Sequence, residues 1–185
     1  MIDFDFQKKR WQTLKDKKVF ETPIFNLHKK QCQPEEDKAP GDFFILDAPE
    51  WVNVLALTED NRFILVEQYR HGIDRVTLEI PGGMADPNEK PAGAAKRELE
   101  EETGYSSKNW QPLGKVSSNP AILTNYTHLY LATGCRKTAS QQSDGFEDIK
   151  IHTVEEDLFY QLVEEGVIHH SIVVAAVAKY LLKFR

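Results

Sequence analysis

Short apolar runs separated by polar turns dominate the first 80 residues of the chain. Apolar runs of four to eight residues, bounded by turn-forming residues, predict β-strands. The expected strands lie within residues 18–29, where Pro23 interrupts them, and at 43–47, 51–58, 62–69 and 76–80. A tight turn at Pro49 should join two of these strands, and Glu59-Asp60-Asn61 should form a hairpin turn. The polar, turn-rich segment 31–41 is expected to be a loop.

The pattern changes its period after Gly83. Residues 91–103 are rich in Ala, Glu, Lys and Leu, which favour an α-helix, and Pro91 and Gly104 suit its first turn and its end. Further strands are expected at 111–117, 127–133 and 149–154, and helices at 155–165 and 170–184. Strands combined with one helix in mid-chain and two at the end predict an α/β or α+β sandwich, and not a doubly wound Rossmann fold.

Composition and charge are typical of a folded, intracellular protein. Hydrophobic residues make up 41% of the chain and charged residues 28%, so the chain can bury a core. The net charge of −6 argues against general binding to DNA or RNA. Cys32 and Cys135 show no metal-ligand spacing and make no disulfide framework, which favours a reducing cytoplasm. No apolar run has the length of a signal peptide or a membrane span, so no membrane partner is expected.

Three glutamates stand close together within the expected helix. Glu98, Glu101 and Glu102 are three and four residues apart, so their carboxylates project from one helix face. Hard cations such as Mg²⁺ and Mn²⁺ prefer oxygen ligands, and clustered carboxylates without a cation repel one another. A glutamate-rich helix is also common as a solvated surface, and the three residues alone do not decide between the two roles.

The residues around the glutamates favour the metal. Glycines, glutamates and an arginine recur at fixed spacings, namely Gly83, Glu89, Arg97, Glu98, Glu101, Glu102 and Gly104. This pattern resembles the Nudix box in every position, and the flanking segments extend the resemblance over most of the chain. The resemblance implies an α/β Nudix fold, in which a mixed β-sheet is sandwiched between helices and the box forms a loop, a helix and a second loop.

The resemblance also implies hydrolysis of a nucleoside diphosphate that is linked to another moiety. Glu98 and Glu102 are expected to be the main ligands of two or three Mg²⁺ or Mn²⁺ ions. Glu101 is expected to be an additional ligand, and the Gly82 carbonyl is expected to complete the site. Arg97 and Glu89 should orient these glutamates through an ion pair rather than contact the substrate. Glu101 and Arg97 are counted among the expected catalytic residues, together with a general base.

Three features that flank the box resemble the ADP-ribose and nucleotide-sugar pyrophosphatases. They are EQYRHG…VTLEIPGG (67–83), Pro120, which lies 15 residues beyond Tyr105, and EDIKIHTV (147–154) followed by a helix. Arg70 matches the arginine of a Gln-Tyr-Arg motif in this subgroup, and it is expected to hold a phosphate or to form a salt bridge. Glu79 is expected to contact substrate or metal-bound water, or to form an ion pair.

The general base is expected on the loop that follows the central strands. That loop is Ser143–Asp148, where Glu147 is the first candidate and Asp144 is the alternative. A base must come within hydrogen-bond reach of the attacking water, and the sequence does not decide which residue does so. Three histidines have no role in this mechanism and are expected at the surface or at helix caps, namely His71, His169 and His170.

Residues 1–48 are expected to form a strand-rich, N-terminal extension ahead of a Nudix hydrolase domain at 49–185. Apolar residues recur in this extension too sparsely for a core of its own, so the extension must pack on something. The subgroup resemblance implies a homodimer in which residues before 50 build part of the base pocket. Phe43 is a candidate for stacking on the base, although a core aromatic fits its pattern better. Pro120 is a candidate substrate contact or an ordinary loop proline.

The sequence thus predicts a cytoplasmic, metal-dependent hydrolase. Its expected partner is a small-molecule nucleotide sugar, either ADP-ribose or a related compound, which it cleaves to a nucleoside monophosphate and a sugar phosphate. The alternatives are a Nudix hydrolase of oxidised nucleoside triphosphates and a non-catalytic Nudix module that binds a nucleotide and regulates a partner. Modules of that kind usually lose box glutamates, and this chain keeps all of them.

Overall fold

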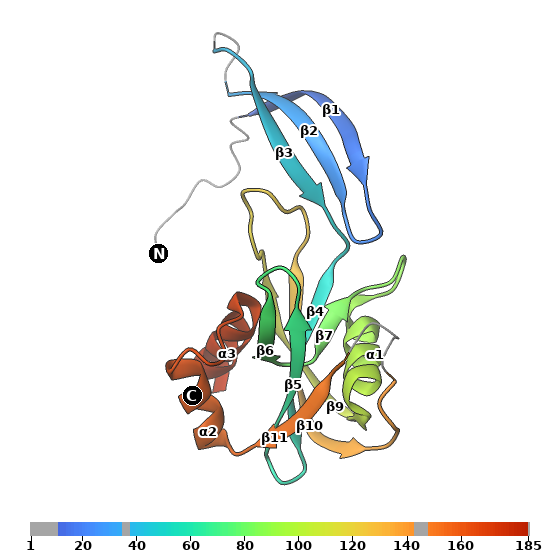
Figure 1. The fold of residues 1–185 in the computed structure, drawn as a ribbon, viewed down its shortest axis with the longest axis vertical. Helices are drawn as coiled ribbons and strands as arrows, with labels where there is room; N and C mark the ends of the chain where they lie inside the picture. The colour runs from blue at the N-terminus through green and yellow to red at the C-terminus, as the bar shows by residue number, and fades with distance from the viewer. Residues whose placement is uncertain (1–10, 35–37, 143–147, 185) are drawn as a thin grey trace. The chain divides into compact units, whose positions relative to one another are not determined.

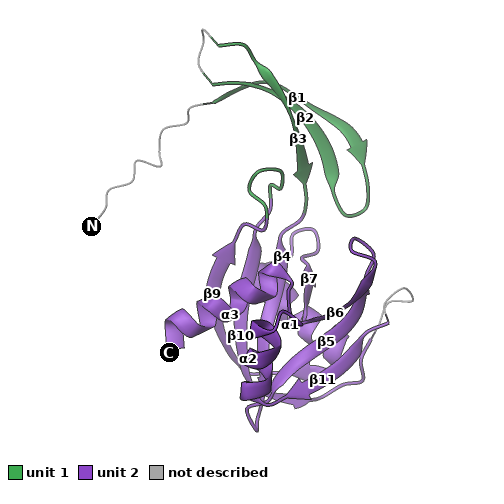
Figure 2. Ribbon diagram, turned by 60° about the vertical axis from the view of Figure 1, so that its left-hand side comes forward, with its two compact units in different colours: residues 1–48, 119–124 green, residues 49–118, 125–185 purple. Residues whose placement is uncertain are grey.

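A computed structural model describes residues 11–34, 38–142 and 148–184. The contacts within the chain divide it into two compact units, residues 1–48 with 119–124 and residues 49–118 with 125–185 (Figure 2). Segment 119–124, which contains Pro120, therefore belongs with the N-terminal unit although it lies far along the chain.

The N-terminal unit contains a three-stranded antiparallel sheet in the order β1-β2-β3 (Figure 1). Its strands are β1 (Gln12–Glu21), β2 (Asn26–Gln33) and β3 (Gly41–Asp47). The Thr22 hydroxyl closes the β1–β2 hairpin by accepting a hydrogen bond from the Phe25 N–H over 2.9 Å. Segment 119–124 runs beside β3, where the Leu46 N–H donates to the Ile122 carbonyl over 2.7 Å. The β-rich character expected for this end of the chain is confirmed.

Two local predictions for this region are wrong. Residues 31–33 do not belong to a loop but extend β2, where Cys32 pairs with Gly41 of β3. No residue of β2 is fully buried, so no alternation of apolar and polar side chains marks the end of the strand. The turn at Pro49 does not close a hairpin, because the strand that follows, β4 (Trp51–Thr58), lies in the other sheet.

The second unit is built on an eight-stranded sheet with the order β11-β5-β4-β10-β8, in which β6, β7 and β9 pair with β5, β4 and β10. The further strands are β5 (Phe63–Arg70), β6 (Arg75–Glu79), β7 (Gly82–Met84), β8 (Tyr105–Ser106), β9 (Asn109–Val116), β10 (Thr127–Lys137) and β11 (Lys150–Val154). The helices are α1 (Pro91–Thr103), α2 (Glu156–Glu164) and α3 (Ser171–Phe184). β4 runs parallel to β10 and antiparallel to β5, so the sheet is mixed, as expected.

Helices cover both faces of the mixed sheet (Figure 1), and alternate side chains of β4 enter two hydrophobic clusters. Val54 packs in one cluster with Leu99 of α1. Leu55 packs in the other with Phe159 of α2 and Val173 of α3. This confirms the predicted sandwich of a mixed sheet between helices. None of the helices in the described ranges combines the length and apolar character needed to span a membrane.

Helix α1 begins and ends where the sequence signals place it. Pro91 lies in its first turn, and Gly104 ends it with a left-handed backbone at φ 71°. The Gly104 N–H donates to the Glu100 carbonyl over 2.7 Å, and a Cβ on Gly104 would fall 2.3 Å from the Ala139 carbonyl oxygen. Both the backbone conformation and the close approach therefore require glycine at this position.

Candidate active site

Two consecutive glycines bring strand β7 close to the central sheet and to helix α1. Gly82 pairs with Asn53 of β4, and a Cβ on Gly82 would fall 2.2 Å from the Val52 carbonyl oxygen. A Cβ on Gly83 would fall 2.5 Å from Oε1 of Glu98. The Glu98 carboxylate therefore packs directly on the backbone of Gly83, at a distance at which any side chain on residue 83 would displace it.

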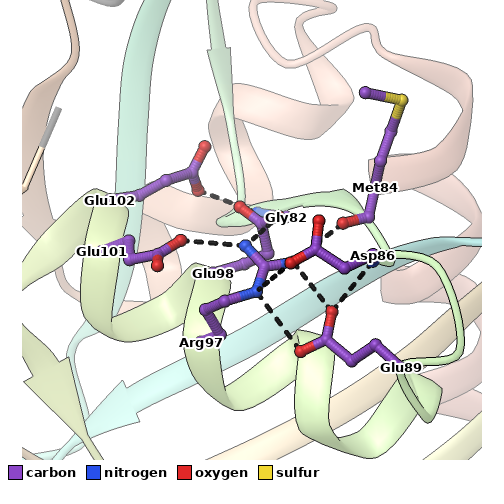
Figure 3. A network of polar contacts seen from close by, with 8 residues as sticks. All are labelled: Gly82, Met84, Asp86, Glu89, Arg97, Glu98, Glu101 and Glu102. Atoms are coloured by element: carbon purple, nitrogen blue, oxygen red, sulfur yellow. Dashed lines mark hydrogen bonds and ion pairs between the residues drawn. The ribbon is translucent and has the colours of Figure 1, made fainter. Parts of the chain in front are cut away.

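Glu102 is held by the same strand (Figure 3). The residue is only 6% exposed, and its Oε2 accepts a hydrogen bond from the Gly82 N–H over 2.9 Å. A buried carboxylate is costly unless donors satisfy it, and the backbone of β7 supplies one. The structure thus places Glu102 beside Gly82, the residue whose carbonyl is predicted to share its metal ion.

Arg97 links the two other expected metal ligands of α1, Glu98 and Glu101 (Figure 3). Its Nη1 donates hydrogen bonds to Oε1 of Glu98 over 2.9 Å and to Oε2 of Glu101 over 2.8 Å. Hydrogen bonds between charged partners are among the stronger ones in proteins, and the guanidinium offsets the repulsion between the two carboxylates. One positive charge therefore holds both side chains in place.

The same guanidinium fixes the loop that precedes α1. Its Nη2 donates to Oε2 of Glu89 over 3.0 Å and to the Met84 carbonyl over 2.9 Å. The Asp86 N–H also donates to Glu89, over 3.0 Å. The hydrogen bonds from Arg97, and then the one from Asp86, hold the pKa of Glu89 below its ordinary value. The bonds to Glu89 are in turn the main cause that raises the pKa of Arg97, so both groups stay charged at neutral pH.

The donor set of the site fits a hard divalent cation. The three box glutamates present carboxylate oxygens from one helix, beside the backbone of Gly82, and Mg²⁺ and Mn²⁺ prefer such ligands. Glu98 and Glu101 turn toward Arg97, and among the described residues no three acidic, histidine or cysteine side chains converge as a metal centre would need. A cation bound by these glutamates would therefore share their carboxylates with Arg97.

A second polar cluster surrounds Glu79 at the end of β6. Glu79 is 1% exposed, and Arg70 of β5 binds it through Nε to Oε1 and through Nη2 to Oε2, each over 2.8 Å. Oε1 also accepts a hydrogen bond from the Thr77 hydroxyl over 2.7 Å, and Oε2 lies 2.6 Å from Nδ1 of His170. Burial alone would raise the pKa of Glu79, but the hydrogen bonds from Arg70 and His170 outweigh it, so this pKa lies far below its ordinary value.

The ion pair that the sequence left open as an alternative role for Arg70 and Glu79 is present, whereas the contact with His170 was missed. His170 directly precedes α3, as a helix-cap residue would, but its ring reaches Glu79. Glu79 and His170 are 91 positions apart, and no local motif connects them, so only the folded chain reveals the contact.

Two of the expected substrate-binding residues belong to the N-terminal unit. Phe43 is 41% exposed and meets the Trp11 ring edge-on, with ring centroids 5.5 Å apart, so it is not a core aromatic. Pro120 is exposed within segment 119–124. The two candidates for the general base, Glu147 and Asp144, lie outside the described residues.

Comparison with curated proteins gives relatives over nearly the whole chain. The methanol dehydrogenase activator of Bacillus methanolicus is 32% identical over 170 residues, which cover 90% of each chain. The ADP-ribose pyrophosphatase of Bacillus subtilis is 28% identical over 175 residues, which cover 93% of each chain. The ADP-sugar pyrophosphatase of Mus musculus is 32% identical over 128 residues, 66% of this chain and 59% of that one.

Solved structures and family models agree with the fold. The crystal structure of an ADP compounds hydrolase superposes with a TM-score of 0.81 at 20% identity, over 93% of this chain and 92% of that one. The model of the NUDIX domain matches residues 49–170. The matched range contains the two glycines of β7, Arg97 and the three glutamates described above, and the chain belongs to the Nudix family.

Proposed function

We propose that the protein is a pyrophosphohydrolase that cleaves ADP-ribose or a related nucleoside diphosphate sugar into a nucleoside monophosphate and a sugar phosphate. The observation that carries this proposal is the set of three glutamates on α1, Glu98, Glu101 and Glu102, which Arg97 and Gly82 join to strand β7. The names of the Bacillus subtilis and Mus musculus relatives support the substrate class.

The residues of the box would position a pyrophosphate and the water that attacks it. A divalent cation held by the glutamates would neutralise phosphate oxygens and lower the pKa of a bound water. Glu102 is a rigid ligand because the Gly82 N–H holds it, and Arg97 keeps Glu98 and Glu101 aligned. Membership of the family supports a divalent-cation requirement, and two or three Mg²⁺ or Mn²⁺ ions are our specific proposal.

Two further residues complete the proposed mechanism. Arg70 is the proposed contact for a phosphate of the substrate, because its side chain is 41% exposed and Glu79 fixes its orientation through two hydrogen bonds. Glu147 is the proposed general base, which takes the proton of the attacking water, and Asp144 is the alternative.

The N-terminal unit is proposed to supply part of the base pocket in a two-fold homodimer. Every residue of β1 is exposed, including Phe20, and Trp11 just before the strand is exposed as well. Exposed apolar side chains of this kind are typical of surfaces that an interface covers. The exposed ring of Phe43 is the proposed stacking partner of the base, and Pro120 of the same unit is the proposed neighbouring contact.

A second candidate function is the regulation of another enzyme. The Bacillus methanolicus relative, which matches 90% of this chain, is named as an activator of methanol dehydrogenase. This role does not exclude hydrolysis, because the chain keeps every glutamate of the box.

A substrate panel tests the proposed function. The panel contains nucleotide sugars including ADP-ribose, dinucleotides, coenzyme A and oxidised nucleoside triphosphates, all with Mg²⁺. A coupling phosphatase releases inorganic phosphate from the monophosphate products, and this phosphate is measured. For the triphosphates, the release of pyrophosphate is measured. We expect ADP-ribose or a GDP- or UDP-linked sugar to give the highest kcat/KM. A large preference for triphosphates would contradict the substrate class, and hydrolysis of no compound would favour the regulatory role.

A further inference from the structure

His170 connects the start of helix α3 to the ion pair between Arg70 of β5 and the buried Glu79 of β6. Its carbonyl accepts a hydrogen bond from the Val174 N–H over 3.1 Å, which opens α3, while Nδ1 of its ring lies 2.6 Å from Oε2 of Glu79. The helix thus fixes the backbone of His170, and the ring reaches a strand from an earlier part of the chain. The box itself does not use this contact.

The hydrogen bonds on Glu79 determine which atom of His170 carries a proton. Glu79 is ionised at neutral pH because its pKa lies far below the ordinary value, and an ionised carboxylate only accepts hydrogen bonds. Nδ1 of His170 is therefore the donor. Each oxygen of Glu79 then has two donors. Oε1 accepts from Arg70 and Thr77, and Oε2 accepts from Arg70 and His170.

This arrangement couples His170 to the guanidinium of Arg70. Loss of the His170 ring would leave Oε2 of Glu79 with one of its two donors. An apolar side chain at position 170 would cover this oxygen but offer it no donor, so the carboxylate, which is 1% exposed in the native protein, would regain a donor by turning. Arg70 binds both oxygens in a planar fork, so the guanidinium must turn with the carboxylate.

We propose that His170 is a positioning residue for substrate binding, whose hydrogen bond to Glu79 sets the orientation in which Arg70 meets the diphosphate. The inference rests on the proposed function, since it takes Arg70 as a phosphate contact. Thr77, which lies in the same strand as Glu79, donates to Oε1 of Glu79. His170, which lies at the start of α3, donates to Oε2. Helix α3 therefore takes part in setting the phosphate contact.

The experiment compares variants of His170 with a matched histidine in the full-length protein. His170→Leu and His170→Phe remove the donor, and the second keeps a ring in case the first does not fold. His170→Asn keeps an N–H donor close to the place of Nδ1. His169→Leu is the control, because His169 is exposed and its Nδ1 lies 3.2 Å from the Val167 carbonyl, with no contact to Glu79. KM and kcat for ADP-ribose, and the Kd of inorganic pyrophosphate with Mg²⁺, are measured for each.

We expect the variants that lack the donor to bind more weakly without losing turnover. KM and the pyrophosphate Kd should rise about tenfold, as for the loss of one hydrogen bond to a charged group, while kcat stays within about twofold. His170→Asn should recover most of the affinity, and His169→Leu should behave like the wild type. In an Arg70→Ala background, His170→Phe should cause no further loss of affinity for ADP-ribose or pyrophosphate.

Two results would overturn the inference. One is a lower Tm with unchanged KM and Kd, which would make His170 a purely structural residue. The other is a rise in KM and Kd caused by His170→Phe that is as large in the Arg70→Ala background as in the wild type. If the wild type hydrolyses no nucleotide sugar, the proposed function fails separately. The pyrophosphate Kd then still decides, since weaker binding by His170→Phe supports the inference and equal or absent binding in both proteins contradicts it.

Discussion

The Gly82 N–H and the buried carboxylate of Glu102 are joined by a 2.9 Å hydrogen bond between β7 and the last turn of α1. The neighbouring Glu98 carboxylate touches the backbone of Gly83 from the same helix. Two glutamates from successive turns of α1 thus lie against the two glycines of β7. The proposed metal site is therefore built from the contact between a helix and two residues of strand backbone.

Replacing Glu102 by glutamine should remove activity and keep the fold. The glutamine oxygen still accepts the Gly82 N–H, but the charge that a cation needs is lost. We expect kcat/KM to fall by about a hundredfold or more, since several kcal/mol of transition-state stabilisation depend on the metal. Glu100→Gln is the control, because Glu100 is exposed on the same helix. Steady-state kinetics and circular dichroism provide the measurement, and equal activity of the two variants would contradict the role of Glu102.

Replacing Gly83 by alanine should disturb the site more than the fold. The new Cβ would fall 2.5 Å from Oε1 of Glu98, which lies at the end of a flexible side chain and can move away. We expect kcat/KM to fall about tenfold, with a loss of only about 1 kcal/mol in stability. Gly93→Ala is the control, because its Cβ would approach Glu89 no closer than 3.7 Å. That variant should keep its activity and gain up to about 1 kcal/mol in helix stability. Wild-type kinetics for Gly83→Ala would show that the contact with Glu98 is unimportant.

The ion pair between Glu79 and Arg70 should make the free energy of unfolding depend on pH. Folding lowers the pKa of Glu79, and a carboxylate of this kind stabilises the native state fully above its unfolded pKa. The contribution of Glu79 should therefore be complete at neutral pH and decrease as the pH falls below the ordinary value of 4.5. Glu79→Gln should cost about 1–3 kcal/mol at pH 7, since the buried acceptor loses its charge-assisted hydrogen bonds while the half-exposed Arg70 side chain regains contact with water.

Urea unfolding of the wild type and of Glu79→Gln, at several pH values between about 7 and 3, checks this prediction. The difference in the free energy of unfolding should shrink as the pH falls below 4.5, because Glu79 then takes up a proton in the unfolded state of the wild type while it stays ionised in the native state. A difference that stays constant over the whole range would show that the charge of Glu79 does not stabilise the fold.

The proposed dimer predicts both a mass and a binding effect. Light scattering of the full-length protein should give twice the chain mass of 21.2 kDa. Phe43→Ala should raise KM for ADP-ribose several-fold, because stacking of an aromatic ring on a base contributes about 1–3 kcal/mol. Phe44→Ala is the matched control, since Phe44 is also exposed but points to the other face of β3. A monomer, or equal KM values for the two variants, would leave the N-terminal unit without its proposed role.

The parts of the site that depend on local sequence could be predicted. Helix α1 begins near Pro91 and ends before Gly104, and these residues act within one turn of the chain. The face shared by Glu98, Glu101 and Glu102 follows from the period of the helix once its bounds are known. The spacing of the glycines and of Arg97 then identified the box, because each position has a specific residue type.

The remaining features depend on contacts between distant parts of the chain. The end of β2 was expected to be a loop because none of its residues is fully buried, so no apolar pattern marks it. The residues after Pro49 enter a different sheet, which no turn signal reveals. His170 reaches Glu79 across 91 positions, and the adjacent histidines at 169 and 170 give no hint in the sequence that one of them has a carboxylate partner. Such contacts are determined by the fold and not by a local pattern.

The most direct test of the central claim is to identify the products of ADP-ribose by ³¹P NMR. The wild type and Glu102→Gln are compared with Mg²⁺, and the wild type is also measured with excess chelator. We predict AMP and ribose 5-phosphate from the wild type with Mg²⁺, and little of either from the other two samples. Undiminished turnover in excess chelator, or products that retain the pyrophosphate bond, would contradict the account.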